Sequence, residues 1–435
     1  MEYIIKLELI QPVSQIVHHK LHEQNRSLAP PLSLAQIAAL TPPEFEVSIS
    51  DENISAVDLT KDVDLVGITT LTQTANRAYE IADSYRARGV KVVIGGIHAS
   101  VLPEEASQHA DSVVIGEAEG IWATVIEDFK SNNLKQIYKQ DNRPDLANLP
   151  IPRRDLFDKS SYLVPQTLIT TRGCPYNCSF CSVTTFMGHS YRCRPVQDVI
   201  EEIETLDTNK PILFLDDNIT GNPKFAKELF RALIPYKINW VGQCSVTIAK
   251  DDELMKLAAD SGCMLLAIGF ESVSPTNLTT VGKKANWVDK YEADIKKIHS
   301  YGIGIHGFFI FGFDEEKEDV FDRTLRFAQN MKLESAQFSL LRPYPGTALY
   351  ESLDKDGRLL TKDWAEYKEG LVFEPKSMPK DKLEKGQIWT FNKFYSLFSI
   401  FRRVGFFRRH AIKLWGINLY YRSHWRKKVR DNKNQ

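Results

Sequence analysis

The sequence predicts an α/β protein with a doubly wound parallel sheet, then a partial, open barrel of six βα units and a mostly helical C-terminal region. Short runs rich in β-branched residues alternate with amphipathic stretches from residue 64 onward, and several of these runs end in glycine or small polar residues. The chain has 435 residues, more than one hydrophobic core usually supports, so we expect more than one domain.

The composition is that of an ordinary globular protein, with 43% hydrophobic residues, 26% charged residues and a net charge of −1. This charge excludes a generally basic nucleic-acid binder. Six cysteines in a chain of this length do not suggest a secreted disulfide framework. The opening apolar run is short and is interrupted by Lys6 and Glu8, unlike a signal peptide, and no stretch approaches the ~20 apolar residues of a transmembrane helix. We therefore expect a protein of the reducing cytoplasm.

Residues 1–140 form the first expected domain. Strands are predicted at 64–72, 90–96 and 111–117, with helices at 75–88 and after Pro103. This spacing is typical of a doubly wound parallel sheet, whose ligands bind at the carboxyl ends of the strands. The residues at those ends are Thr69, Thr70, Gly95, Gly96, Gly116 and Glu117.

Residues 141–165 contain four prolines and few regular signals, so they form the expected linker. The second domain covers residues 166–350. Its strands are predicted at 167–171, 212–215, 239–246, 264–270, 305–311 and 334–340. Its helices are predicted at 195–206, 223–233, 251–260, 287–300 and 316–331. In a βα barrel the active residues lie at the C-terminal ends of the strands.

A cysteine loop follows the first of these strands, with the spacing Cys174-x3-Cys178-x2-Cys181. A [4Fe–4S] cluster ordinarily takes four cysteines, so three thiolates on one loop leave one iron open to another ligand. A structural zinc site needs four ligands, usually as two pairs, and a bacterial ferredoxin has a different cysteine order. The remaining cysteines supply no second pair: they are Cys193, Cys244 and Cys263. The loop therefore predicts an open [4Fe–4S] cluster.

The cysteine loop, with the aromatic residue Phe180 before its last cysteine, resembles the hallmark of the radical S-adenosylmethionine (SAM) superfamily. The resemblance extends over most of the chain. It implies that the open iron chelates SAM, that reductive cleavage of SAM gives a 5′-deoxyadenosyl radical, and that Phe180 lies near the adenine. It also implies an external electron donor, a reductase with a flavodoxin or a ferredoxin.

Further strand ends resemble the SAM contacts of this superfamily. Asp216 and Asp217 resemble the acidic strand end that binds the SAM amino group. Adjacent residues of a strand point to opposite faces, so only one of the two can point inward, and a helix cap or a turn is the alternative role. Glu271 resembles a residue near the SAM ribose and carboxylate, with a structural ion pair as the alternative. The strand containing Phe309 resembles one whose backbone contacts adenine. The predicted SAM-binding residues are Phe180, Asp216, Asp217, Ser245, Glu271 and Phe309.

The first domain resembles the cobalamin-binding domain of B12-dependent radical SAM enzymes, through the segments at 30–40, 51–53, 67–72, 95–99 and 116–119. Gly95 and Gly96 permit close approach of a ligand to the backbone. His98 lacks the Asp and Gly of the Asp-x-His-x-x-Gly motif, so no axial histidine is indicated. Functional cobalamin and a retained fold without a corrin both remain open. The predicted cobalamin-binding residues are Thr69, Thr70, Thr72, Gly95, Gly96, His98, Gly116 and Glu117.

Residues 351–435 are expected to be mostly helical, and residues 391–428 mix aromatic side chains with clustered arginine and lysine. A helical period places Phe394, Phe398 and Phe401 on one face, next to Arg402 and Arg403. Three interpretations remain open. They are a helix packed on the barrel with solvated arginines, a helix in a membrane interface, and an RNA-binding surface.

Together these features predict a cobalamin-dependent radical SAM methyltransferase that acts on an unactivated carbon of a small or lipid-like metabolite. The alternatives are a cyclase or rearrangement enzyme without methyl transfer, and a corrinoid or cluster sensor without turnover. A methylthiotransferase-like modifier of RNA or protein is disfavoured because no second cluster motif is present. We expect a cytoplasmic enzyme, with contact to a membrane through the C-terminal region as one of the open interpretations, and we do not expect a nucleic-acid partner.

Overall fold

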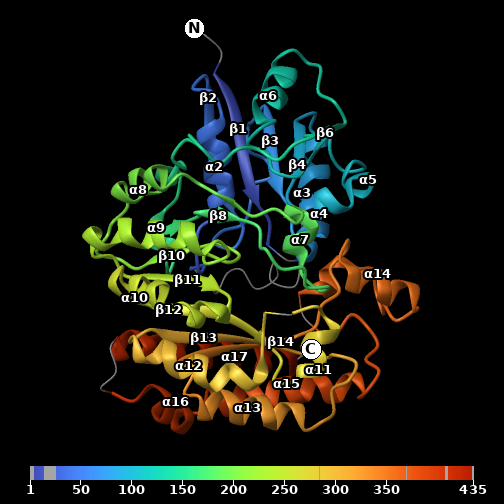
Figure 1. The fold of residues 1–435 in the computed structure, drawn as a ribbon. Helices are drawn as coiled ribbons and strands as arrows, with labels where there is room; N and C mark the ends of the chain where they lie inside the picture. The colour runs from blue at the N-terminus through green and yellow to red at the C-terminus, as the bar shows by residue number, and fades with distance from the viewer. Residues whose placement is uncertain (1–3, 14–25, 284, 369, 407–409, 434–435) are drawn as a thin grey trace.

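A computed structural model describes residues 4–13, 26–283, 285–368, 370–406 and 410–433 (Figure 1). The N-terminal domain contains a six-stranded parallel sheet with the strand order β2-β1-β3-β4-β5-β6. Its strands are β1 (Ile5–Gln11), β2 (Phe45–Asp51), β3 (Leu65–Thr69), β4 (Lys91–Gly95), β5 (Ser112–Ile115) and β6 (Ile137–Lys139). The predicted doubly wound sheet is therefore confirmed, with the order reversal between β1 and β3 that characterises ligand-binding sheets.

Helices cover both faces of this sheet. They are α2 (Leu32–Leu40), η2 (Thr72–Thr74), α3 (Ala75–Arg86), α4 (Ile97–Val101), α5 (Pro103–Ala106) and α6 (Trp122–Lys130). The strands β1 and β2 and the helix α2 were not predicted from the sequence. Glu8, in the middle of β1, is fully buried and accepts hydrogen bonds from the hydroxyls of Tyr85 (2.7 Å) and Ser50 (2.5 Å). A buried and partnered carboxylate breaks the apolar pattern by which a strand is recognised.

The second domain contains a six-stranded parallel sheet with the order β14-β13-β12-β11-β10-β7. Its strands are β7 (Thr167–Leu168), β10 (Ile212–Phe214), β11 (Trp240–Cys244), β12 (Cys263–Glu271), β13 (Gly304–Phe311) and β14 (Ser335–Leu340). In the described chain β7 and β14 pair with one neighbour each, so the barrel is open. The predicted partial barrel is confirmed.

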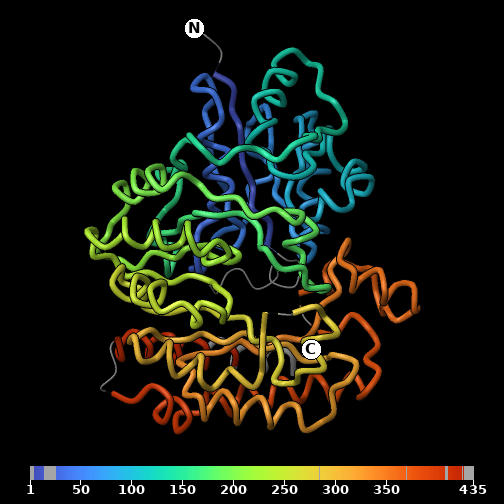
Figure 2. Tube along the Cα trace, in the orientation of Figure 1, coloured from blue at the N-terminus to red at the C-terminus, as the bar shows by residue number. Residues whose placement is uncertain are grey.

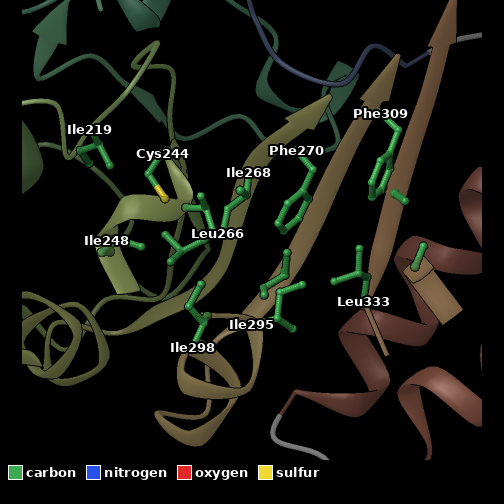
Figure 3. Packing of buried hydrophobic residues seen from close by; sticks show 14 of the residues in the cluster. Ile219, Cys244, Ile248, Leu266, Ile268, Phe270, Ile295, Ile298, Phe309 and Leu333 are labelled. Atoms are coloured by element: carbon green, nitrogen blue, oxygen red, sulfur yellow. The ribbon is translucent and has the colours of Figure 1, made fainter. Parts of the chain in front are cut away.

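The long helices of the barrel follow its strands in the predicted order: α8 (Val196–Glu204), α9 (Pro223–Leu233), α10 (Asp252–Asp260), α12 (Tyr291–Ser300) and α13 (Val320–Asn330). Their apolar sides and the outward-facing strand residues form one large core (Figure 3). Shorter elements are η3 (Arg154–Leu156), η4 (Lys159–Ser161), α7 (Ser182–Met187), η5 (Ile234–Tyr236), η6 (Val246–Lys250), α11 (Pro275–Thr280) and η7 (Val288–Lys290). A two-stranded antiparallel ribbon joins β8 (Thr171–Arg172) and β9 (Arg192–Cys193).

The chain beyond the barrel first returns to the N-terminal domain, which lies above the barrel in the tube view (Figure 2). This part contains α14 (Ala348–Lys355) and η8 (Trp364–Tyr367), and Trp364 and Tyr367 pack into the core of the N-terminal domain. The helix α14 spans residue 350, where we had expected a domain boundary. The two domains are therefore held together by a segment that the sequence assigned to the C-terminal region.

Three helices end the chain against the barrel: α15 (Lys380–Phe394), α16 (Leu397–Val404) and α17 (Ala411–Lys433). The expected shared face of Phe394, Phe398 and Phe401 is wrong, because Ser396 caps a new helix and separates Phe394 from the other two. Phe394 is fully buried, whereas Phe398 is 71% exposed and Phe401 is 50% exposed. The basic-aromatic region thus has one side packed on the barrel and one side in solvent.

One of the three interpretations, a packed helix with solvated arginines, is wrong in one respect, because Arg403 is 1% exposed. Its guanidinium donates to the carbonyls of Leu333 (2.6 Å), Glu334 (2.9 Å) and Phe394 (3.1 Å), and lies 3.6 Å from the centre of the Phe394 ring. Arg402, one residue earlier, is exposed. Among the described helices, none has the length and apolar character needed to cross a bilayer.

Candidate functional site

The cysteine loop runs from β8 to α7 at the C-terminal end of the barrel strands. Cys178 is buried, and Cys174 and Cys181 are half-buried. The loop is fixed from two sides, because the amide of Ser179 donates to the carbonyl of Val281 (3.0 Å) and its carbonyl accepts from the amide of Leu349 (2.9 Å). The three thiols therefore lie on a loop whose backbone is held by distant segments of the chain.

The three thiols suit a cluster better than a single metal ion. In the described part of the chain, no three His, Cys, Asp or Glu side chains come close enough to share one ion. Cysteines that each bind a different corner of a cubane do not need to converge on one point. Burial raises the pKa of the Cys178 thiol to about 11, partly offset by the nearby Lys283 ammonium, and burial also raises the pKa of Cys181. Iron binding must therefore displace protons from these thiols.

The two acids after β10 have different surroundings. Asp216 is 2% exposed, and its Oδ1 accepts from the hydroxyls of Thr170 (2.7 Å) and Thr171 (2.6 Å) and from both of their amides (3.1 and 2.5 Å). Burial raises the pKa of Asp216 to about 6, although these hydrogen bonds oppose the shift. Asp217 is half-buried and accepts one hydrogen bond, from the amide of Gly173 (3.3 Å), next to Cys174. Asp216 thus holds the strand that leads into the loop, and Asp217 keeps carboxylate oxygens available for a ligand.

Asn218 is a site residue that the sequence analysis missed. It is 3% exposed, its Nδ2 lies 3.9 Å from the Sγ of Cys174, and its Oδ1 accepts from the amide of Ser245 (3.2 Å). It therefore joins the first cluster cysteine to the end of β11, where Ser245 caps η6. The sequence contained a clue, because Asn218 directly follows the acidic pair Asp216-Asp217. A neutral amide at a strand end, however, is a weaker indication of a ligand site than a carboxylate.

Glu271 ends β12 in an unusual backbone conformation, with φ +62°, and the pairing of β12 with β13 shifts register there. Its carboxylate is buried and accepts from the ammonium of Lys283 at 2.7 Å. A Cβ on Gly269 would lie 2.3 Å from Oε1 of Glu271 and 3.0 Å from Nζ of Lys283. Gly269 therefore makes room for this ion pair, and the Gly-x-Glu spacing has a steric reason. Backbone strain of this kind is concentrated at functional sites.

The two aromatic residues of the predicted SAM site, Phe180 and Phe309, have different surroundings. Phe180 is half-buried and packs against the barrel core. Phe309 is 1% exposed and stacks on Phe270 (ring centres 5.7 Å apart) and Phe338 (5.6 Å). Phe270 and Phe309 lie side by side on neighbouring strands, within the core (Figure 3). The side chain of Phe309 is therefore a core residue, and a contact of this strand with SAM would be made by its backbone.

An apolar cavity of about 250 Å³ lies at the strand ends of the N-terminal domain, between the sheet and the start of the barrel. Gly96 has φ +98°, and a Cβ there would lie 2.6 Å from the backbone of Thr70. Gly116 has φ +87° and open space beside it. The bare backbone and the apolar walls provide a surface against which one side of a large flat ligand such as a corrinoid could pack. The lining includes Gly67, Thr69, Gly95, Gly96, Gly116, Glu117, Phe186 and Met187.

The other predicted cobalamin residues have partners within the protein. The hydroxyl of Thr70 donates to the carbonyl of Gly95 (2.8 Å). His98 is 1% exposed, with Nδ1 3.3 Å from the hydroxyl of Thr72 and Nε2 3.2 Å from the carboxylate of Glu105. Thr72 and His98 line a second cavity, of about 200 Å³, between the N-terminal domain and α7. Both ring nitrogens of His98 are engaged, which agrees with the absence of an axial-histidine motif.

Glu117 is held by arginines. Its carboxylate accepts from the guanidinium groups of Arg172 (2.5 Å), Arg143 (3.2 Å) and Arg192. Burial alone would raise the pKa of Glu117, but the Arg172 and Arg192 charges hold it below the usual value. Glu117 is therefore ionised at neutral pH and lies on the wall of the apolar cavity as part of an ion-pair cluster.

A third cavity, of about 440 Å³, lies between the two domains at the open edge of the barrel. Arg342 is on its wall and donates to the carbonyl of Gly370 (3.4 Å). This cavity shares three lining residues with the cavity beside α7, so the two adjoin. The shared residues are Leu71, Gln73 and Tyr344.

Known proteins give the same division of the chain. The model of the radical SAM superfamily matches residues 168–328, and that of the B12 binding domain matches residues 26–126. The chain is 34% identical to the bacteriochlorophyllide d C-12(1)-methyltransferase of Chlorobaculum tepidum, over 91% of this chain and 88% of the relative. It is 32% identical to the C-8(2)-methyltransferase for the same compound in that organism, over 77% and 78%.

Among solved structures, the cobalamin-dependent SAM radical enzyme OxsB, with aqua-cobalamin and SAM bound, matches with a TM-score of 0.71. The match covers 97% of this chain and 72% of OxsB at 15% identity, and it shows the shared fold. The two family models and the two methyltransferase relatives confirm the expected cofactors and the enzyme class, and they support neither a corrin-free domain nor a sensor without turnover. The chain belongs to the radical SAM superfamily, among its B12-binding members, and is an enzyme that uses a [4Fe–4S] cluster, SAM and cobalamin.

Proposed function

We propose that this enzyme is a C-methyltransferase that moves a methyl group to an unactivated carbon of a small or lipid-like metabolite. The observation that carries the proposal is the pair of adjoining cavities between the cysteine loop and the strand ends of the B12-binding domain. A substrate there would lie between the two cofactors. The relatives named above methylate carbon positions, which favours methyl transfer over cyclisation or rearrangement.

The cofactors supply the difficult chemistry, a carbon radical generated from SAM and a methyl group carried by cobalamin. The protein residues bind and orient. Cys174, Cys178 and Cys181 would hold the cluster. Asp217 and Glu271 would hold the polar groups of SAM. The glycine-lined cavity of the N-terminal domain would hold cobalamin.

The interdomain cavity indicates the kind of substrate. Its wall combines aromatic rings with side-chain amides, which fits a molecule with a flat apolar body and polar edges. Its charged lining residues are both cations. The aromatic and charged residues of the lining are Tyr344, Tyr367, Trp425, Arg342 and Lys368, and the amides are Gln11, Asn53, Gln73, Gln337 and Gln387.

The proposal is tested with anaerobically reconstituted holoenzyme, SAM carrying a trideuterated methyl group, and a metabolite extract of the native cells. A reduced flavodoxin or ferredoxin with its reductase supplies electrons, as we propose for the cell. We expect 5′-deoxyadenosine and a product heavier by the labelled methyl group. Cys178→Ala should abolish both, and Cys263→Ala, a core cysteine at the far end of β12, should retain both. Formation of 5′-deoxyadenosine together with an unlabelled, rearranged product would contradict methyl transfer.

We further infer that the enzyme works in the cytoplasm at a membrane surface. The outer side of α16, Phe406 just after it and the start of α17 expose large apolar side chains: Phe398 (71%), Phe406 (63%) and Ile412 (90%). Residues 396–435 contain eleven lysines and arginines and one acidic residue, Asp431. Exposed aromatic residues within a basic segment are typical of surfaces that bind anionic lipid.

Vesicle flotation of the full-length enzyme tests this contact. We expect binding to vesicles that contain anionic lipid, and loss of binding in a Phe398→Ser/Phe401→Ser double variant. Leu163→Ser removes an apolar side chain of 41% exposure far from α16 and serves as the matched control. Equal flotation of the double variant and the native enzyme would show that α16 is not the contact.

A further inference from the structure

One buried carboxylate links the B12-binding domain to the cysteine loop. Glu117 follows β5 and Gly116 at a strand end of the N-terminal domain, and its side chain is 3% exposed. Its Oε2 accepts from Arg172 at 2.5 Å, and its Oε1 accepts from Arg143 at 3.2 Å and from Arg192. All three arginines lie outside the strands and helices of the N-terminal domain.

Two of these arginines lie at the ends of the cluster segment, and the third, Arg143 of the linker, contacts its α7 helix. Arg172 ends β8, two residues before Cys174, and Arg192 stands opposite to it in β9. Arg143 also donates to the carbonyl of Phe186 in α7 at 2.9 Å. Residues 172–192, which contain all three cluster cysteines, are therefore held at their start, at their end and at α7 by arginines that converge on Glu117.

The free-energy cost of burying these charged groups suggests that they fix the arrangement of the two segments. Arg172 pairs with both Glu117 and Glu119, and the side chains of these three residues are 13%, 3% and 8% exposed. Moving charges out of water is expensive, so such a group is stable only while its partners stay in place. Apolar residues would bury the same interface at less cost. The best-attested use of buried charge is to fix register between packed elements, because a shifted arrangement leaves an unpaired charge.

The same residues form a wall of the cavity that fits cobalamin. Gly116, Glu117, Arg172, Phe186 and Met187 all line it. A ligand in this cavity therefore touches the strand end of one domain and the cluster segment of the other.

We propose that Glu117 is a positioning residue that fixes the placement of cobalamin relative to the [4Fe–4S] cluster. It does so by holding Arg143, Arg172 and Arg192. The proposal depends on the two cofactors of the family and not on the substrate or on methyl transfer, so it stands or falls separately from the proposed function.

The test measures the magnetic interaction between the cofactors in the holoenzyme. Cob(II)alamin and the reduced cluster are both paramagnetic, and the oxidised cluster is not. In the native enzyme, reduction of the cluster should raise the microwave power that saturates the cobalt EPR signal. In Glu117→Gln we expect loss of most of this increase, while iron content and the corrin absorption spectrum stay unchanged.

Two further variants make the outcome decisive. Glu52→Gln removes a buried carboxylate that pairs with Arg77 (2.6 Å) inside the N-terminal domain, and it should behave like the native enzyme. Arg143 is the most exposed of the three arginines, so its replacement should disturb folding least. Arg143→Gln should lose part of the increase in saturating microwave power. The proposal is overturned if Glu117→Gln keeps the native saturation behaviour, or if Glu52→Gln loses it equally. Where Glu117→Gln does not fold, native behaviour of Arg143→Gln overturns the proposal.

Discussion

Replacing each of the two acids after β10 with its amide distinguishes their roles. In Asp216→Asn, Oδ1 can keep the four hydrogen bonds from Thr170 and Thr171, and the new amide nitrogen takes the place of Oδ2. The single contact of Oδ2 is with the amide of Thr170 at 3.3 Å. The substitution thus changes one weak contact and removes one buried charge.

The expected magnitudes follow from burial and from the available partners. Burial raises the pKa of Asp216 to about 6, so keeping the group ionised at pH 7 costs about 3 kcal/mol of folding free energy, which the amide avoids. This gain offsets the weaker acceptor strength of an amide, so we expect stability within about 1 kcal/mol of the native enzyme and unchanged SAM affinity. In Asp217→Asn, a lost hydrogen bond to the SAM ammonium of ~1.5–3 kcal/mol would weaken SAM binding by about 10- to 150-fold.

The assay is the binding of SAM to the reconstituted enzyme by calorimetry, with iron content and thermal unfolding measured on the same samples. The reasoning is refuted if Asp216→Asn binds SAM at least tenfold more weakly with its cluster intact while Asp217→Asn binds normally. In that case the buried carboxylate would be the ligand, and its bonds to Thr170 and Thr171 would have to open when SAM binds.

Three other changes test separate features. Gly269→Ala places a Cβ 2.3 Å from Glu271, so we expect weaker SAM binding by calorimetry, whereas Gly416→Ala, with open space around it, should bind SAM normally. Arg403→Met leaves buried carbonyls unpaired and should lower the unfolding free energy by about 3–5 kcal/mol in urea, against less than about 0.5 kcal/mol for the exposed Arg402→Met. Burial raises the pKa of Glu316 from 4.5 to about 8, so the folded state keeps this proton longer than the unfolded state, and the stability it contributes at low pH is lost between about pH 4.5 and 8. Glu316→Gln should make this fall in stability shallower by up to about 1.4 kcal/mol per pH unit in unfolding curves at pH 5–8, and an unchanged slope would contradict the assignment.

Much of the fold could be predicted because the barrel strands are short apolar runs with glycine or polar residues at their ends. The spacing of the cysteines likewise indicated the cluster without any tertiary information. The prediction failed where buried charge interrupts the apolar pattern, as Glu8 does in β1. It also failed where a late segment returns to an early domain, as Trp364 does, because no local signal records a contact that spans more than 250 residues.

Within the site, the sequence located the right strand ends but could not assign roles to neighbouring residues of the same kind. Asp216 differs from Asp217, and Arg403 from Arg402, only through partners far along the chain. Those partners are the threonines 45 and 46 residues before Asp216 and the carbonyls about 70 residues before Arg403. Glu117 was predicted to bind cobalamin because it ends a strand of the sheet, but its surroundings are set by arginines of the cluster segment. A position at a strand end therefore predicts proximity to the cofactors. Whether a side chain contacts a cofactor or instead holds the chain around it depends on which residues, distant in the sequence, pack against it in the folded protein.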